Sequence, residues 1–84
     1  MPERIKLTEK VVRDATPMPG RDYQIFDSEL RGFAVCIYRG GGRAFTLDYR
    51  HAGRQRRMTF GRWPEWSVAA ARDRAKALRR EIDV

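Results

Sequence analysis

Residues 43–60, with the sequence RAFTLDYRHAGRQRRMTF, decide the fold because they contain two strands joined by a short turn. On each side of the turn apolar and polar residues alternate, which is typical of a strand with one buried face. The expected antiparallel partners are Arg50–Gln55, Asp48–Arg57, Leu47–Met58, Thr46–Thr59 and Phe45–Phe60. A slip by one residue would bury Arg57 and expose Met58, so the pattern predicts both the hairpin and its register.

Other short strands are predicted before this hairpin. β-branched and aromatic residues interrupted by glycine favour strands, and the close spacing of these runs implies antiparallel connections. The expected strands cover residues 23–27, 32–38, 43–50 and 55–60. A short helix over residues 8–15 is expected in front of them, because Thr8 is a suitable capping residue and Pro17 ends the pattern.

After the hairpin the apolar period becomes that of a helix. Ser67 is placed to cap a helix over residues 68–82. The apolar residues of this helix form one narrow, alanine-rich stripe: Val68, Ala71, Ala75, Leu78 and Ile82. Such a stripe suits close packing on a sheet. We therefore predict an α+β fold, with a three- to four-stranded antiparallel sheet packed on one face by the C-terminal helix and with a short N-terminal helix.

The chain length limits what the protein can do. Its 84 residues suffice for a single domain, residues 1–84, with one modest core. A chain of this size buries only about 60–65% of the surface that it exposes when unfolded, which leaves little room for a secluded catalytic cavity. The sequence also lacks paired carboxylates, a nucleophile triad and a glycine-rich loop that opens a helix. We expect that this chain is not an enzyme.

Positive charge is concentrated in the second half of the chain. The net charge is +7, and residues 43–84 carry eleven basic and five acidic side chains, against seven and six in residues 1–42. All six basic residues between positions 43 and 62 are arginines. Arginine matches phosphate oxygens and the guanine edge with two parallel hydrogen bonds. The basic excess predicts a nucleic acid as the partner, and the arginine-only cluster favours readout of double-stranded DNA. The alternatives are an anionic membrane surface and simple solubility.

The second face of the predicted sheet has no element left to cover it, so it must meet solvent or a partner. An antiparallel ribbon fits the major groove of DNA. Side chains that alternate along this face are expected to reach base edges: Thr46, Arg50, Gln55, Arg57 and Thr59. Side chains at strand ends and turns are expected to contact phosphates: Arg39, Arg43, His51, Arg54 and Arg62. The alternative is a polar face that is merely solvated.

Several other residues have a structural explanation. Trp63 and Trp66 are expected to clamp the start of the last helix rather than to stack on bases. Tyr38 fits equally well as a DNA contact and as a strand former. Solvation and the helix dipole explain the basic residues of the last helix: Arg72, Lys76, Arg79 and Arg80.

The sequence predicts no cofactor, no metal and no small-molecule ligand. A single cysteine, Cys36, and a single histidine, His51, can form neither a disulfide nor a zinc site. No segment reaches the roughly 20 apolar residues of a membrane span, and the N-terminus lacks the apolar core of a signal peptide. We expect no membrane partner, and a cytoplasmic location in association with the nucleoid.

Motifs along most of the chain carry a resemblance to a known family. In the first half they comprise residues 7–8 with the short helix that follows, 21–23, 26–27 and 30–35. In the second half they comprise the strand 45–50, the basic strand 53–60, the Gly-Arg-Trp-Pro turn 61–64 and the helix start 67–72. These motifs resemble the N-terminal arm-type DNA-binding domain of phage and genomic-island integrases of the tyrosine recombinase class.

The resemblance implies that a small sheet enters the major groove at arm-type sites and so supports DNA integration and site-specific recombination by a longer integrase. The core-binding and catalytic domains would then lie beyond residue 84, so no tyrosine here is expected to be a nucleophile. The chain is expected to be bacterial or phage-encoded and to assemble with other integrase protomers. The alternatives are a protein-interaction module for integrase assembly or accessory factors, an RNA binder and a small nuclease.

Overall fold

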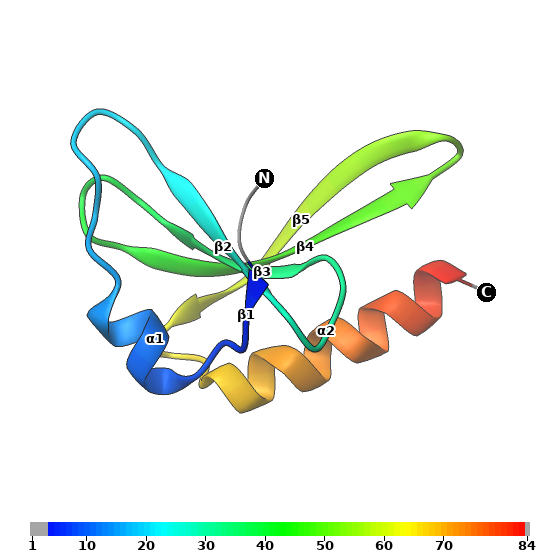
Figure 1. The fold of residues 1–84 in the computed structure, drawn as a ribbon. Helices are drawn as coiled ribbons and strands as arrows, with labels where there is room; N and C mark the ends of the chain where they lie inside the picture. The colour runs from blue at the N-terminus through cyan, green and yellow to red at the C-terminus, as the bar shows by residue number, and fades with distance from the viewer. Residues whose placement is uncertain (1–3, 84) are drawn as a thin grey trace.

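A computed structural model describes residues 4–83 of the chain. In chain order its elements are β1 (Arg4–Ile5), α1 (Glu9–Asp14), β2 (Tyr23–Asp27), β3 (Phe33–Ile37), β4 (Arg43–His51), β5 (Arg54–Trp63) and α2 (Val68–Asp83). The five strands form one sheet in sequence order. Both helices lie on the same side of this sheet (Figure 1).

The α+β class and the two predicted helices are confirmed, but the prediction of three to four antiparallel strands is wrong. The structure adds β1 as a fifth strand, which pairs in parallel with β2 and places Arg4 opposite Phe26. The remaining neighbours, from β2 to β5, are antiparallel. A strand of two residues is too short to show an alternating pattern, so sequence periodicity could not predict β1.

The hydrophobic core lies between the sheet and the two helices. From the sheet it takes five fully buried side chains: Phe33, Val35, Ile37, Phe45 and Leu47. From α2 it takes Val68, Ala71, Ala75 and Leu78, with Ile82 packed at its edge. The predicted stripe is therefore confirmed, and its alanines let the helix axis approach the sheet closely.

The register of β4 and β5 is confirmed at four of the five predicted pairs. The fifth is wrong because a β-bulge next to Phe45 inserts one extra residue, so that Phe45 faces Gly61 instead of Phe60. Phe60 instead stacks on Phe33, with ring centroids 6.3 Å apart, and meets Trp66 edge-on at 6.2 Å. A Cβ atom on Gly61 would lie 2.9 Å from the Trp66 ring, so the glycine makes room for this aromatic contact.

Hydrogen bonds fix both helix starts, as the sequence predicts. Thr8 caps α1 and Ser67 caps α2 through their side-chain oxygens. In addition, the Glu9 carboxylate accepts hydrogen bonds from Trp63 Nε1, at 2.9 Å, and from the backbone N–H of Val68. These two bonds lower the pKa of Glu9. Trp63 thus helps to hold the start of α2, which confirms its predicted structural role.

A buried ion pair joins the end of β2 to α2. The Asp27 side chain is fully buried and lies 3.0 Å from Arg72 Nη2. The same carboxylate accepts the backbone N–H groups of Leu7, at 2.9 Å, and Leu30, at 2.8 Å. The expectation that Arg72 is merely solvated is therefore wrong. Its partner is 45 residues away in the chain, and no helical pattern could reveal that pairing.

Candidate nucleic-acid interface

No helix or strand within residues 4–83 covers the sheet surface opposite the helices (Figure 1). We call this surface the polar face. Strand register places the following side chains on it: Gln24, Cys36, Thr46, Asp48, Arg50, Gln55, Arg57, Thr59 and Arg62. The small residues Ala34 and Ala44 share this face and are buried, so the taller side chains of β2 and β5 stand on either side of a depression.

This depression, the polar groove, has a volume of about 320 Å³. It is lined by Asp22, Tyr23, Gln24, Cys36, Tyr38, Thr46, Arg57 and Thr59. Burial raises the pKa of the Cys36 thiol, so the thiol is neutral at pH 7. The groove therefore presents amide, hydroxyl and guanidinium groups, which hydrogen-bond to base edges, together with the carboxylate of Asp22.

Arg57 is held in a defined orientation beside the polar groove. Its Nε donates to Asp48 Oδ1 at 3.0 Å, while 56% of the Arg57 side chain stays exposed. A pair this exposed contributes little to stability. It does fix the plane of the guanidinium, and neither Nη atom donates a hydrogen bond to any residue in the range 4–83. Both Nη groups are free to meet two acceptors on a guanine.

The prediction that Thr46 is exposed to bases is wrong. Thr46 is 1% exposed, and its hydroxyl accepts a hydrogen bond from Gln24 Nε2 at 3.0 Å. Gln24, which covers the Thr46 hydroxyl, belongs to β2. Alternation within the β4–β5 hairpin does not reveal where β2 lies. Gln24 was missed as a member of the interface, although alternation along residues 23–27 could have assigned it to this face. Its amide oxygen stays available in the polar groove, where glutamine can pair with adenine.

The other four residues predicted to face bases fall into two places. Arg57 and Thr59 line the polar groove, whereas Arg50 and Gln55 line a second cavity near the tip of the β4–β5 hairpin. All four are exposed. Alternation along the strands had predicted one group of base-facing residues, whereas the structure divides these four between two separate cavities.

Four of the five predicted phosphate contacts are accessible. Arg39, His51, Arg54 and Arg62 are exposed. His51 and Arg54 pair at the tip of the hairpin, and Arg62 lies opposite Ala44 near the other end of β5. Exposed arginines therefore flank the polar groove at both ends of the hairpin, with His51 beside Arg54 at the tip. This is the placement that a bound duplex needs to have its backbone held on either side.

The prediction that Arg43 contacts phosphate does not fit the structure. The Arg43 guanidinium lies 5.8 Å from the Trp63 ring and is turned toward the end of α1. There it donates to the backbone carbonyls of Val12, Arg13, Ala15 and Gly41. The last carbonyls of a helix lack partners within the helix, and Arg43 supplies them. Alternation along β4 places Arg43 on the same face as Phe45 and Leu47, toward the helices. The pattern could not identify the acceptors, because they belong to a distant segment.

A family model described as an Arm DNA-binding domain matches residues 7–84, which include both helices and strands β2 to β5. The chain belongs to the Arm DNA-binding domain family. The family is found in integrases, and its domain is a non-catalytic module that binds double-stranded DNA. The match confirms the resemblance carried by the strand and turn motifs. A comparison with curated proteins finds no match to this Arm DNA-binding domain.

Two further observations apply to residues 4–83 of the Arm DNA-binding domain. Within residues 4–83, no group of three or more histidine, cysteine, aspartate or glutamate side chains is arranged to hold a metal ion. None of the helices in this range is long and apolar enough to span a membrane.

Replacing Arg43 by alanine is expected to lower the free energy of unfolding by about 2 kcal/mol, because charge-assisted hydrogen bonds to several carbonyls are lost. Urea unfolding followed by tryptophan fluorescence measures this change. The affinity of the folded variant for DNA should stay within about twofold of the wild type. The matched control is Arg62→Ala, which removes an exposed arginine and should leave the stability within about 0.5 kcal/mol. An R43A variant of normal stability but weak DNA binding would restore the phosphate role.

Proposed function

We propose that this Arm DNA-binding domain recognises arm-type sites in double-stranded DNA by placing its polar face in the major groove. The observation that carries this proposal is Arg57, whose guanidinium is oriented by Asp48 at the edge of an uncovered groove. Arg57, Thr59 and Gln24 are the side chains best placed to read bases. The exposed residues at the ends of the hairpin would hold the backbone: Arg39, His51, Arg54 and Arg62.

We further propose that the domain acts within a longer integrase and supports site-specific recombination and DNA integration. Support comes from the family, which is found in integrases. Core binding and strand cleavage would belong to other domains of that protein, a tyrosine recombinase encoded by a phage or a genomic island. In that setting the domain would meet other integrase protomers on the same DNA, in the cytoplasm of the host and in contact with its nucleoid.

Salt dependence tests whether the binding is to the DNA backbone at all. Fluorescence anisotropy with a labelled duplex from the element's own attachment region should give a slope of log K against log salt of about −4 to −5, which corresponds to four to six neutralised phosphates. An affinity independent of salt would contradict the proposal. It would favour instead a module that docks another integrase subunit or an accessory protein.

Replacing Arg57 by alanine tests the base-reading role. The loss should be about 1–3 kcal/mol on the specific duplex and should disappear when the base pair that Arg57 reads is changed. Arg74→Ala is the matched control, since Arg74 is an exposed arginine on α2, away from the sheet surface. If R57A and R74A bind the specific duplex equally well, Arg57 does not read bases.

A further inference from the structure

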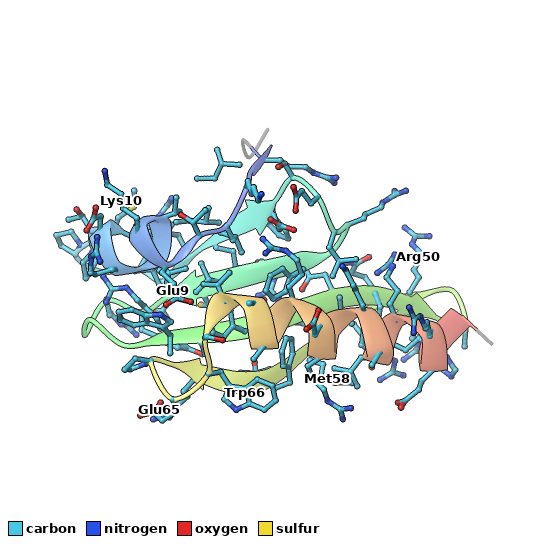
Figure 2. All side chains as sticks on the ribbon, turned by 90° about the horizontal axis from the view of Figure 1, so that it is seen from below. Glu9, Lys10, Arg50, Met58, Glu65 and Trp66 are labelled. Atoms are coloured by element: carbon cyan, nitrogen blue, oxygen red, sulfur yellow. The ribbon has the colours of Figure 1, made fainter. Side chains whose placement is uncertain are left out.

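A second cavity lies where the β4–β5 hairpin extends past the neighbouring strand. The last pair between β3 and β4 joins Phe33 to Leu47, and the backbone N–H of Asp48 still donates to the Gly32 oxygen at 2.9 Å. Beyond Asp48 the hairpin extends past the end of β3. Below this overhang runs the C-terminal half of α2 (Figure 1). Figure 2 shows Arg50 at the end of the molecule where the last turns of that helix lie. The cavity has a volume of about 390 Å³, and its lining includes Asp48, which the strand register places on the polar face.

Four arginines from four different segments line this cavity, which we call the arginine pocket: Arg4 of β1, Arg31 of the turn before β3, Arg50 of β4 and Arg79 of α2. Like charges that converge on one cavity repel each other, so an anion in the cavity relieves an unfavourable arrangement. The one acidic side chain in the lining is Asp48, whose carboxylate is engaged by Arg57 at 3.0 Å. The positive charge of the pocket is therefore not neutralised from within.

The guanidinium groups of the arginine pocket are available to a ligand. The side chains of Arg31 and Arg50 are exposed and make no hydrogen bond or ion pair with any residue from 4 to 83. Arg79 is half-buried, and its Nη1 lies 3.5 Å from the backbone oxygen of Asp48. One arginine is thus held in place by the sheet, while two others can close on a ligand.

We propose that the arginine pocket binds a phosphate of the DNA backbone next to the bases that the polar groove reads. The inference rests on the proposed function. Asp48 makes the two sites adjacent, because its carboxylate orients Arg57 in the polar groove while its backbone oxygen contacts Arg79 in the pocket. Guanidinium groups bind phosphate oxygens with paired, charge-assisted hydrogen bonds. Helix α2 therefore takes part in DNA binding through Arg79, in addition to covering the core.

The test compares two double variants with equal loss of charge. The first combines Arg31→Ala with Arg79→Ala and removes two of the four arginines that line the pocket. The second combines Arg74→Ala with Arg80→Ala and removes two exposed arginines of α2 that lie outside the pocket. The first variant should bind about tenfold more weakly, both to the specific duplex and to an unrelated one, with a salt slope shallower by about 1. The control should stay within about twofold, because distant exposed charges are screened by salt.

Two additional measurements keep the result interpretable. Arg31→Ala alone should also weaken DNA binding, by about threefold. Because the Arg31 side chain is exposed and has no partner in the described part of the protein, this substitution should not change folding. Thermal melting checks each variant. NMR signals of the Arg31 and Arg79 side-chain Nε–H groups should shift on addition of duplex DNA, and shift less on addition of inorganic phosphate at equal phosphate concentration.

The outcomes separate this inference from the proposed function. If the R31A/R79A double variant binds like its control while R57A still loses specific binding, the inference is wrong and the proposed function stands. If inorganic phosphate shifts the arginine signals and DNA does not, the pocket is a site for free anions, and the inference is likewise wrong. If the wild type binds no DNA, the proposed function fails and the inference fails with it.

Discussion

Replacing Asp27 by asparagine is expected to lower the free energy of unfolding by about 3–5 kcal/mol. The Asp27 side chain is 0% exposed and that of Arg72 is 15% exposed, with 3.0 Å between Oδ1 and Nη2. An asparagine cannot balance the charge of Arg72, which then stays buried without a counterion. The backbone N–H groups of Leu7 and Leu30 also depend on the two carboxylate oxygens. One substitution therefore weakens the contacts of β2, α2 and the segment before α1 together.

The same carboxylate makes stability depend on pH. Burial on its own raises the pKa of Asp27, but the hydrogen bonds from Arg72, Leu7 and Leu30 outweigh it, and the net effect is a pKa below the ordinary value. A group whose pKa is lowered by folding stabilises the protein fully above its unfolded-state pKa, about 3.9 for aspartate. That contribution is lost as the pH falls through the lower pKa of the folded protein. The D27N variant should lack this part of the acid dependence.

Urea unfolding at pH 7 and in the acid range measures both effects. The matched control is Asp22→Asn, which changes a surface carboxylate 4.0 Å from Arg39 with 42% of its side chain exposed. We expect this control to change the stability by less than about 0.5 kcal/mol. Equal stabilities of D27N and D22N at pH 7 would show that the buried pair does not stabilise the fold.

The parts of the fold that the sequence predicts are those controlled by local periodicity. Alternation along residues 43–60 sets the pairing of Asp48 with Arg57, and the helical stripe of α2 sets the side that packs on the sheet. Arg72 follows Ala71 at the edge of that stripe, where a helical pattern predicts a solvated residue. Its true environment depends on where β2 ends in space, and that is a property of the assembled sheet.

In the candidate site, too, strand alternation predicts some side-chain positions, whereas others depend on segments that are distant in the chain. The exposure of Arg57 and Thr59 is confirmed, because it follows from strand alternation alone. Thr46 follows the same alternation, yet its hydroxyl is covered by Gln24 from β2. Arg43 lies on the other face of β4, with Phe45 and Leu47, and donates to the carbonyls at the end of α1. Both corrections come from segments that are distant in the chain. The DNA contacts of the exposed residues stay predictions.

Replacing Gly32 by alanine is expected to lower the free energy of unfolding by at least about 3 kcal/mol, through two separate effects. The first is conformational, since Gly32 has φ +86°, a backbone region that strains any residue with a Cβ atom. The second is steric. A Cβ atom here would lie 2.3 Å from the backbone oxygen of Asp48 and 3.1 Å from Arg79 Nη1. The obstacle is backbone, so it cannot rotate away.

A second glycine separates the two effects. Gly20 has φ +79°, but a Cβ atom there would have no neighbour within 4 Å, so Gly20→Ala should cost only the conformational strain, about 1 kcal/mol. Urea unfolding of both variants measures the difference, and equal losses would show that the close approach at Gly32 does not constrain the sheet. The backbone N–H of Asp48 donates to the Gly32 oxygen at 2.9 Å. Because Asp48 also orients Arg57, the G32A protein that remains folded should bind specific DNA more weakly than G20A does.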